Sequence, residues 1–263
     1  MTADRIPRTV ITLGAAQTLA WASSYYLPAL LAVPMARDLG VSAPTVFAAF
    51  SMALGIAALL GPAAGRRIDR LGGRPLLVAS NLVLATGLGL LATAQGPATL
   101  FLAWAVLGIG MSAGLYEAAF ATLVRLHGQD ARGPITGITL MAGFASTVGW
   151  SLSAWLELQA GWRGACWTWA ALHLLLGLPL NLSLPRAEPR TEPRLPASTD
   201  TTTAAAKPPA PDGRAPSLRQ GVLLSFAFTL VLFISTAMAA HLPRLLVASG
   251  LSLAAAVALG GLV

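Results

Sequence analysis

Long uninterrupted runs of apolar residues dominate the chain, and only short polar stretches separate them. A helix needs about 20 mainly apolar residues to cross the hydrocarbon core of a bilayer. Seven runs meet this length, and Glu117 is the only Asp, Glu, Lys or Arg within them. These are Val10–Met35, Pro44–Ala64, Pro75–Ala94, Ala98–Val124, Pro134–Leu156, Gly164–Leu184 and Gly221–Ala240. Continuous runs predict membrane-spanning helices, because a transmembrane β-strand alternates apolar and polar positions.

Composition supports the same class of protein. Only 10% of the 263 residues are charged, whereas a soluble domain has about a quarter. The mean hydropathy of +0.70 excludes disorder for the bulk of the chain. Cys166 is the single cysteine, which excludes a disulfide framework. The chain is therefore predicted to be an all-α polytopic membrane protein.

The arginines predict how the chain is oriented. With the N-terminus inside, 14 basic residues fall in inner segments and three in outer segments, namely Arg37, Arg163 and Arg244. Inner loops of membrane proteins are enriched in basic residues. We therefore expect a multi-pass protein of the cell inner membrane with a cytoplasmic N-terminus. The net charge of +7 follows from this topology, so no nucleic-acid partner is needed.

Proline density divides the chain into three parts. Residues 1–184 hold six of the runs, and 185–219 carry 8 of the 18 prolines with mixed charges, which predicts a flexible cytoplasmic linker. Residues 220–263 hold the seventh run and an eighth, Leu251–Val263, of only 13 residues. A helix of that length covers roughly 20 Å, which is too short to cross. We expect truncation within this eighth helix, or else a shortened protein whose last segment never crosses.

A glycine- and arginine-rich segment connects the second and third runs. Gly72 and Gly73 allow the positive φ that a tight reversal needs, and the arginines hold the segment near anionic headgroups. Its pattern is Gly65-x-x-x-Asp69-Arg70-x-Gly72-x-Arg74. This pattern resembles the signature of the major facilitator superfamily between its second and third helices. An ordinary positive-inside loop would not account for the spacing.

The resemblance implies a fold and a mechanism. The fold would be a six-helix bundle followed by the first one to two helices of a C-terminal bundle. The mechanism would be secondary transport by alternating access, with the first, fourth and seventh helices lining a central cavity. The signature segment would act as a conformational latch, in which Asp69 and Arg70 stabilise the outward-open state through a helix of the second half. That helix would lie beyond Val263, so missing C-terminal helices or a second chain would be needed as partners. Gly73 stands where many members carry arginine, and we expect this departure to weaken little.

The resemblance also bears on the solute. Drug exporters of the family carry a Gly-Pro motif in the fifth helix, whereas this chain has no proline between Gly143 and Trp150. Drug efflux is therefore less favoured. Residues 39–62 look more like the organic-anion and monocarboxylate-type porters. The alternative is a non-transporting sensor, assembly partner or inactive fragment on the same half-fold.

Helical spacing selects candidate solute-site residues in the first run. Gln17, Trp21, Ser24 and Tyr25 share one stripe with Pro28. Pro28 lacks an N–H group and predicts a kink near the site. The alternative is interhelical hydrogen bonding with interfacial aromatic residues.

Two further residues complete the candidate solute or proton site. A charged acid near mid-bilayer costs about 2.5–3.5 kcal/mol, and Glu117 lies about six residues, roughly 9 Å, inward of the midpoint of its run, which disfavours a lipid-facing position. We expect it to exchange a proton, and a structural hydrogen bond is the alternative. Trp150 could stack on an apolar or planar solute. His173 is expected to be a packing residue.

No enzyme chemistry is evident in the sequence. It holds no P-loop, no metal-spaced cluster of histidine, cysteine and carboxylate, and no nucleophile elbow. We therefore expect no enzymatic activity, no catalytic residue, no metal and no cofactor. The expected partners are a small-molecule solute and the lipid bilayer, and proton coupling is left open.

Overall fold

The computed structural model describes residues 5–185 and 218–260, and all regular structure within them is helical. This confirms the all-α prediction. The chain divides into two compact units, Met1–Pro189 with Ala240–Val263, and Arg190–Ala239. The predicted linker, 185–219, lies almost entirely outside the described residues.

The first predicted span is broken in two. Helix α1 (Arg5–Ser23) and helix α2 (Leu27–Asp38) are separated by a short turn, and Pro28 lies in the first turn of α2. Proline fits at this position because the first helical N–H groups have no intrahelical acceptor. The kink predicted near Pro28 is confirmed.

The second span continues through the signature segment. Helix α3 (Ala43–Leu71) begins after Ser42, whose side chain accepts a hydrogen bond from the Thr45 N–H at 3.3 Å. It ends at Gly72, where φ is 84°, and α4 (Gly73–Ala92) starts directly afterwards. The tight reversal that the sequence predicts is therefore a single residue, Gly72. Polar residues end the apolar run near Ala64, but the helix itself continues.

The fourth span contains a break that the apolar pattern does not show. Helix α5 (Pro97–Gly114) and helix α6 (Tyr116–His127) meet at Leu115, whose backbone is extended with φ −92° and ψ −166°. A 3₁₀ turn, η1 (Gly128–Ala131), then leads to α7 (Arg132–Ala142).

Two long apolar passes share helix α8 (Ala145–Leu172). Gly161 interrupts it with a φ of 68°. Trp169 Nε1 donates to Ser153 Oγ at 3.1 Å although 16 residues separate them, a distance of roughly 24 Å along a straight helix. The chain therefore folds back at Gly161. It continues through the π-helical turn η2 (His173–Gly177) and α9 (Leu178–Leu182).

Reversals of the chain explain why the structure has fewer continuous helical stretches than the sequence has apolar runs. Five helical stretches are long and apolar enough to cross a membrane, and one of them, Pro97–Leu182, has 86 residues. This stretch contains the predicted fourth, fifth and sixth runs, divided at η1 and Gly161. The six passes predicted before the linker are therefore present.

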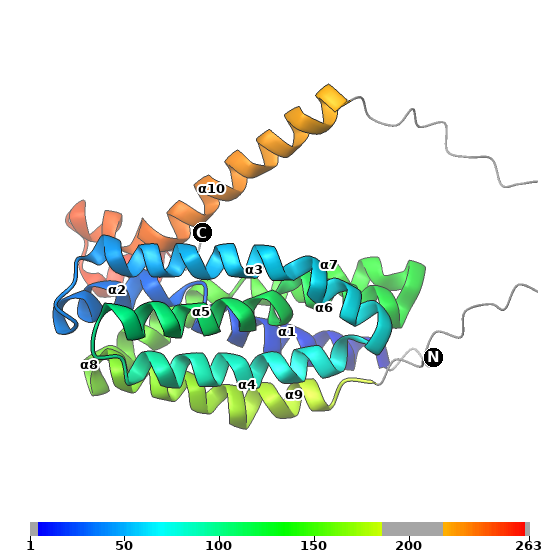
Figure 1. Ribbon diagram of the computed structural model, residues 1–263, viewed down its shortest axis with the longest axis horizontal. Helices are drawn as coiled ribbons and strands as arrows, with labels where there is room; N and C mark the ends of the chain where they lie inside the picture. Colours follow the sequence, from blue (N-terminus) through cyan, green and yellow to red (C-terminus); the bar gives the residue numbers. More distant parts are fainter. Residues whose placement is uncertain (1–4, 186–217, 261–263) are drawn as a thin grey trace, which may run out of the picture. The chain divides into compact units, whose positions relative to one another are not determined.

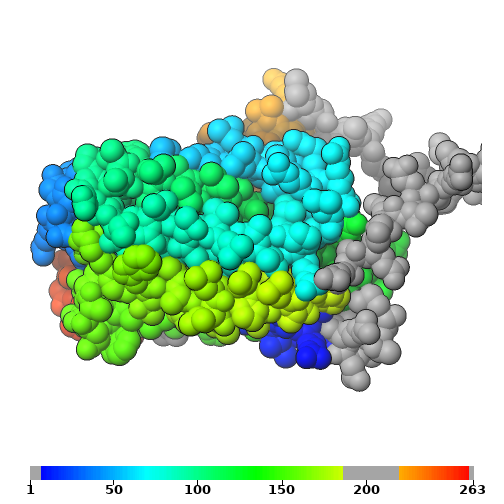
Figure 2. Space-filling view, turned by 60° about the horizontal axis from the view of Figure 1, so that its bottom comes forward, coloured from blue at the N-terminus to red at the C-terminus, as the bar shows by residue number. Residues whose placement is uncertain are grey.

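Helix α5 lies between α3 and α4 and packs along both (Figure 1). Leu84, Leu88 and Trp104 are fully buried at the α4–α5 contact. Figure 2 shows a face on which α4 and the segment through α9, in yellow-green, lie side by side. Exposed leucines on these elements include Leu82, Leu90, Leu174, Leu175 and Leu182. An apolar surface of this kind suits contact with lipid.

Gly108 lets α5 approach α3 closely. A methyl group on Gly108 would lie 2.5 Å from the backbone oxygen of Ala53. Small residues at such contacts allow helices to pack tightly in membranes. We expect Gly108→Ala to lower the free energy of unfolding by about 1–3 kcal/mol, because neither backbone can move alone. Thermal unfolding in detergent measures this change.

Gly55→Ala is the matched control, because a methyl group there meets no atom within 4 Å. It is expected to leave the unfolding midpoint unchanged or slightly raised. Equal midpoints for the two variants would show that the α3–α5 contact adjusts freely.

Polar contacts mark the two ends of the bundle. At one end Arg163 forms an ion pair with Asp38 and donates to the Ala94 carbonyl oxygen at 2.7 Å. At the other, Arg125 Nη1 donates to the carbonyl oxygens of Ile68, at 3.0 Å, and of Asp69. Arg37 and Arg163, predicted to share one membrane side, therefore lie at the end opposite the signature segment. Which end faces the cytoplasm stays a prediction.

The last two helices follow the linker. Helix α10 (Leu218–Ala248) contains the whole predicted seventh run, and α11 (Leu253–Gly260) covers part of the eighth. Residues from Ala240 onward belong to the first unit. There α11 packs on α8, where a methyl group on Gly260 would lie 2.9 Å from the Trp150 ring.

Candidate functional site

The break in the fourth span is bridged by the first helix. In α6 the Ala118 N–H bonds to the Leu115 oxygen, so the Gly114 carbonyl loses its usual helical donor. Gln17 Nε2 supplies one at 2.7 Å, and Gln17 is only 1% exposed. A freed carbonyl buried without a donor would be costly. The amide of Gln17 therefore stabilises the discontinuity.

An aromatic cluster surrounds this break, and we define it as Trp21, Tyr25, Phe50, Trp104, Tyr116 and Phe120. The centroid of Trp21 lies 5.0 Å from Tyr25 and 4.8 Å from Tyr116. Phe120 stacks on Tyr116 at 5.0 Å. Phe50 continues the series between Tyr25, at 5.8 Å, and Trp104, at 5.3 Å. The cluster joins α1, α3, α5 and α6.

Glu117 is the second residue of α6, directly after Tyr116. Its side chain is exposed, and it forms no ion pair or hydrogen bond with any other described residue. Leu102 and Ile109 of the preceding helix α5 are exposed as well. The positive end of α6 favours its negative charge, whereas lipid does not. This face therefore requires water or protein opposite it.

The remaining two candidates lie apart from the break. The Ser24 hydroxyl donates to the Ala20 oxygen of its own helix at 2.6 Å, and Ser24 is fully buried. Trp150 is 2% exposed and meets the edge of Tyr26 at 5.7 Å, while Tyr26 lies 5.3 Å from Tyr25. The structure thus brings Gln17, Trp21, Tyr25 and the start of α6 together and links Trp150 to them through Tyr26. It does not direct the Ser24 hydroxyl there.

The latch residues lie at the other end of the bundle. Asp69 and Arg70 are exposed in the last turn of α3, and Arg74 is half-buried in the first turn of α4. Within the described ranges the Asp69 carboxylate forms no ion pair. Gly65 has open space around it, and Gly72 makes the reversal. Arg125 therefore holds the backbone of this turn and leaves the Asp69 carboxylate available.

His173 connects three passes. Its ring is fully buried, with Nε2 2.7 Å from Ser23 Oγ and Nδ1 2.9 Å from Asn81 Oδ1. Asn81 also donates to the Leu77 oxygen at 2.8 Å, which assigns its Oδ1 as the acceptor. The expectation of a packing histidine is confirmed.

Sequence reasoning missed Tyr116 in the aromatic cluster. It also missed two charged residues, Glu157 and Arg244, that line a separate cavity. Tyr116 was hidden because an aromatic residue in an apolar run gives no distinct signal. Glu157 lies one residue beyond the predicted fifth run, and Arg244 was counted as an outer-loop arginine. A search for charges just outside each apolar run would have found both.

Known proteins are similar to this chain in sequence or in fold. Multidrug resistance protein MdtH from Yersinia pestis (strain Pestoides F) is 33% identical over 152 residues, which cover 56% of this chain and 36% of MdtH. MdtH from Yersinia pseudotuberculosis serotype O:1b (strain IP 31758) matches equally. The chain therefore spans much less than the full length of these relatives.

Solved structures show the same arrangement of helices. Tetrameric PepTSo2 superposes with a TM-score of 0.54 at 16% identity, covering 89% of this chain and 50% of that one. A bacterial homologue of the human drug peptide transporters PepT1 and PepT2 gives 0.53 at 15% identity, covering 89% and 49%. At these identities the likeness concerns the fold alone.

The sequence model of the Major Facilitator Superfamily matches residues 13–263. The match extends from the first helix through the signature segment to the last described helix, and the apolar passes agree with it. This polytopic membrane chain therefore belongs to the Major Facilitator Superfamily.

Proposed function

We propose that the chain contributes to a secondary active transporter that moves a small organic solute by alternating access. The observation that carries this proposal is the bridged break at Leu115. It places Glu117 at the start of a short helix beside the aromatic cluster. Discontinuous helices form solute and ion sites in transporters, because their free ends present backbone charge to a cavity.

Glu117 is proposed to couple transport to protons. Its carboxylate has no partner among the described residues and lies on an exposed face of a membrane pass. It can take up a proton when the site closes and release it when water returns, because a charged form is disfavoured without water. The exposed Asp69 and Arg70 are proposed to latch the second bundle.

An organic anion or monocarboxylate is the favoured solute class, as the resemblance of residues 39–62 implies. A second candidate, drug export, is supported by the 33% identity to MdtH, although the fifth pass lacks a Gly-Pro motif. A non-transporting sensor or assembly partner is the remaining alternative.

Uptake into proteoliposomes tests the proposal. The chain is reconstituted, a proton gradient is imposed, and accumulation of lactate, glucose, alanine and ethidium is measured. We expect lactate to accumulate above empty liposomes. Glu117→Gln should abolish the gradient-driven part and preserve exchange between internal and external lactate.

Asp130→Asn is the matched control, because Asp130 is an exposed acid in η1 outside the site. Its uptake should follow the unaltered chain. Unchanged proton dependence in Glu117→Gln would exclude Glu117 as the coupling residue. Ethidium transport without lactate transport would favour drug export, and no uptake of any solute would favour the non-transporting alternative.

A further inference from the structure

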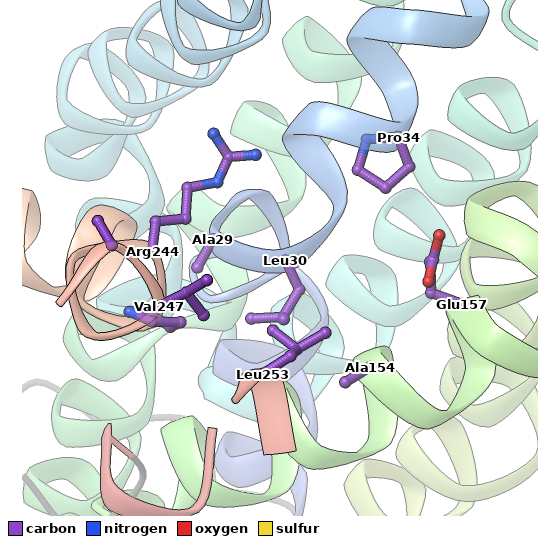
Figure 3. Close-up of a pocket in the computed structure, with 10 residues that line it drawn as sticks. Ala29, Leu30, Pro34, Ala154, Glu157, Arg244, Val247 and Leu253 are labelled. Atoms are coloured by element: carbon purple, nitrogen blue, oxygen red, sulfur yellow. The ribbon is translucent and has the colours of Figure 1, made fainter. Parts of the chain in front are cut away.

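A cavity of about 400 Å³ lies within the first unit, between α2, α8 and the turn from α10 to α11. Its volume falls in the range of small-molecule sites, about 300–1,000 Å³. Most of its wall is apolar, and Figure 3 shows it. The apolar lining includes Ala29, Leu30, Pro34, Ala154, Val247 and Leu253.

Two opposite charges line this cavity without meeting. Glu157 comes from α8 and Arg244 from α10, and both are half-buried. Figure 3 shows them on opposite sides of Leu30 and Leu253. Within the part of the chain that the structure describes, neither forms an ion pair or hydrogen bond. Half-buried charges without partners are costly, so a ligand that supplies both counter-charges would be stabilised here.

The positive side of the cavity is reinforced. Arg37, near the end of α2, lies close enough to Arg244 for their positive charges to interact. Two neighbouring guanidinium groups attract an anion, and a guanidinium binds a carboxylate through two parallel hydrogen bonds. The opposite wall offers only the Glu157 carboxylate, which suits an ammonium group.

The cavity borders the candidate solute site. Trp150, Ala154 and Glu157 follow one another at helical spacing on α8. Ala29, Leu30 and Ala154 line the cavity and also pack in the cluster that contains Trp150. The Trp150 Nε1 group is buried and has no hydrogen-bond partner among the described residues. The Trp150 Nε1 group and the cavity wall that carries Glu157 therefore lie on the same side of α8.

We propose that this cavity binds a small zwitterionic solute, whose carboxylate meets Arg244, whose ammonium group meets Glu157, and whose carbon chain lies along the apolar wall. The inference goes beyond the proposed function, whose favoured solute is an organic anion, by assigning to this cavity a solute that carries an ammonium group besides its carboxylate. It rests on the transport function only for what happens to the solute after binding.

Three ligands with the same carbon chain test the proposal, namely 6-aminohexanoate, hexanoate and hexylamine. Binding to the purified full chain is measured by calorimetry at low salt. We expect 6-aminohexanoate to bind about tenfold more tightly than either singly charged ligand. Glu157→Gln should reduce 6-aminohexanoate to the affinity of hexanoate, and Arg244→Gln should reduce it to that of hexylamine.

Matched variants control for loss of charge alone. Asp130→Asn and Arg132→Gln each remove one exposed charge of the first unit that does not line the cavity, and both should keep the full preference. Glu157→Asp and Arg244→Lys preserve the charges and should retain part of it. If a neutral variant fails to fold, the comparison of three ligands on the unaltered chain still decides.

Equal affinities for the three ligands would overturn the proposal. Zwitterion binding without uptake of 6-aminohexanoate or any other solute would leave the cavity assignment intact and contradict the transport function. Transport of lactate without any preference for 6-aminohexanoate in binding would support the transport function and contradict the cavity assignment.

Discussion

Replacing His173 with alanine is expected to lower the unfolding midpoint of the detergent-solubilised chain by about 5–15 °C. The imidazole is fully buried and joins Ser23 of α1 to Asn81 of α4. Its removal leaves the Asn81 oxygen without that partner and opens a cavity between three passes. Together these effects cost about 2–4 kcal/mol, since buried polar groups left unpaired and cavities each destabilise. Thermal unfolding followed by circular dichroism measures the shift.

Two variants make the His173 result specific. His173→Gln retains hydrogen-bonding groups of both kinds and should recover part of the stability. His241→Ala changes an exposed histidine whose ring contacts Phe47 at 4.6 Å, and it should alter stability by about 1 kcal/mol or less. Midpoints that agree within error for His173→Ala and His241→Ala would show that the buried contacts contribute nothing.

Replacing Gly73 with alanine is expected to separate the start of α4 from α6 and to destabilise the chain by about 1–3 kcal/mol. A methyl group on Gly73 would overlap the hydroxyl of Thr122 and would lie 2.6 Å from its Cβ atom. Rotation of the Thr122 side chain relieves only the first contact, because Cβ is fixed by the backbone. The variant should therefore unfold at a lower temperature and expose the Arg70 region to trypsin sooner.

Gly65→Ala tests the same signature segment without a clash, because a methyl group there meets nothing within 4 Å. It is expected to match the unaltered chain in both measurements. If Gly73→Ala were equally stable, the α4–α6 contact would have to be looser than the structure shows. Thr122 occupies the space that a larger side chain at position 73 would need, and the expectation that the departure at Gly73 weakens the latch little stays a prediction.

Apolar run length predicts the passes because the bilayer imposes one thickness on every spanning helix. It predicts their ends less well, since a helix continues into water wherever its backbone hydrogen bonds remain intact, as α3 does through Arg70. The kink near Pro28 follows from a missing N–H group. The break at Leu115 has no such local signal, because the stabilising donor, Gln17, is 97 residues away.

The candidate site was predictable only in part, because local patterns select residues but do not show which helices pack together. Helical spacing places Gln17, Trp21 and Tyr25 on one stripe, and charge cost isolates Glu117. Neither principle shows that Tyr116 connects this stripe to the helix that carries Glu117, because the contact between Trp21 and Tyr116 depends on how α1 and α6 pack. The Ser24 hydroxyl bonds the Ala20 carbonyl oxygen, as serine in a membrane helix readily does, and its role at the solute site stays a prediction.

The short helix α6 connects the break at Leu115 to the signature segment. Glu117 lies near its start and Arg125 near its end, about 12 Å apart along a helix. The backbone before it is extended at Leu115, and Arg125 grips the last turn of α3. Since a hydrogen-bonded helix of this length moves as one piece, a tilt that repositions Glu117 must also pull on the turn that carries Asp69. We therefore expect occupancy of the proposed site at Glu117 to be transmitted through α6 to the turn that carries Asp69.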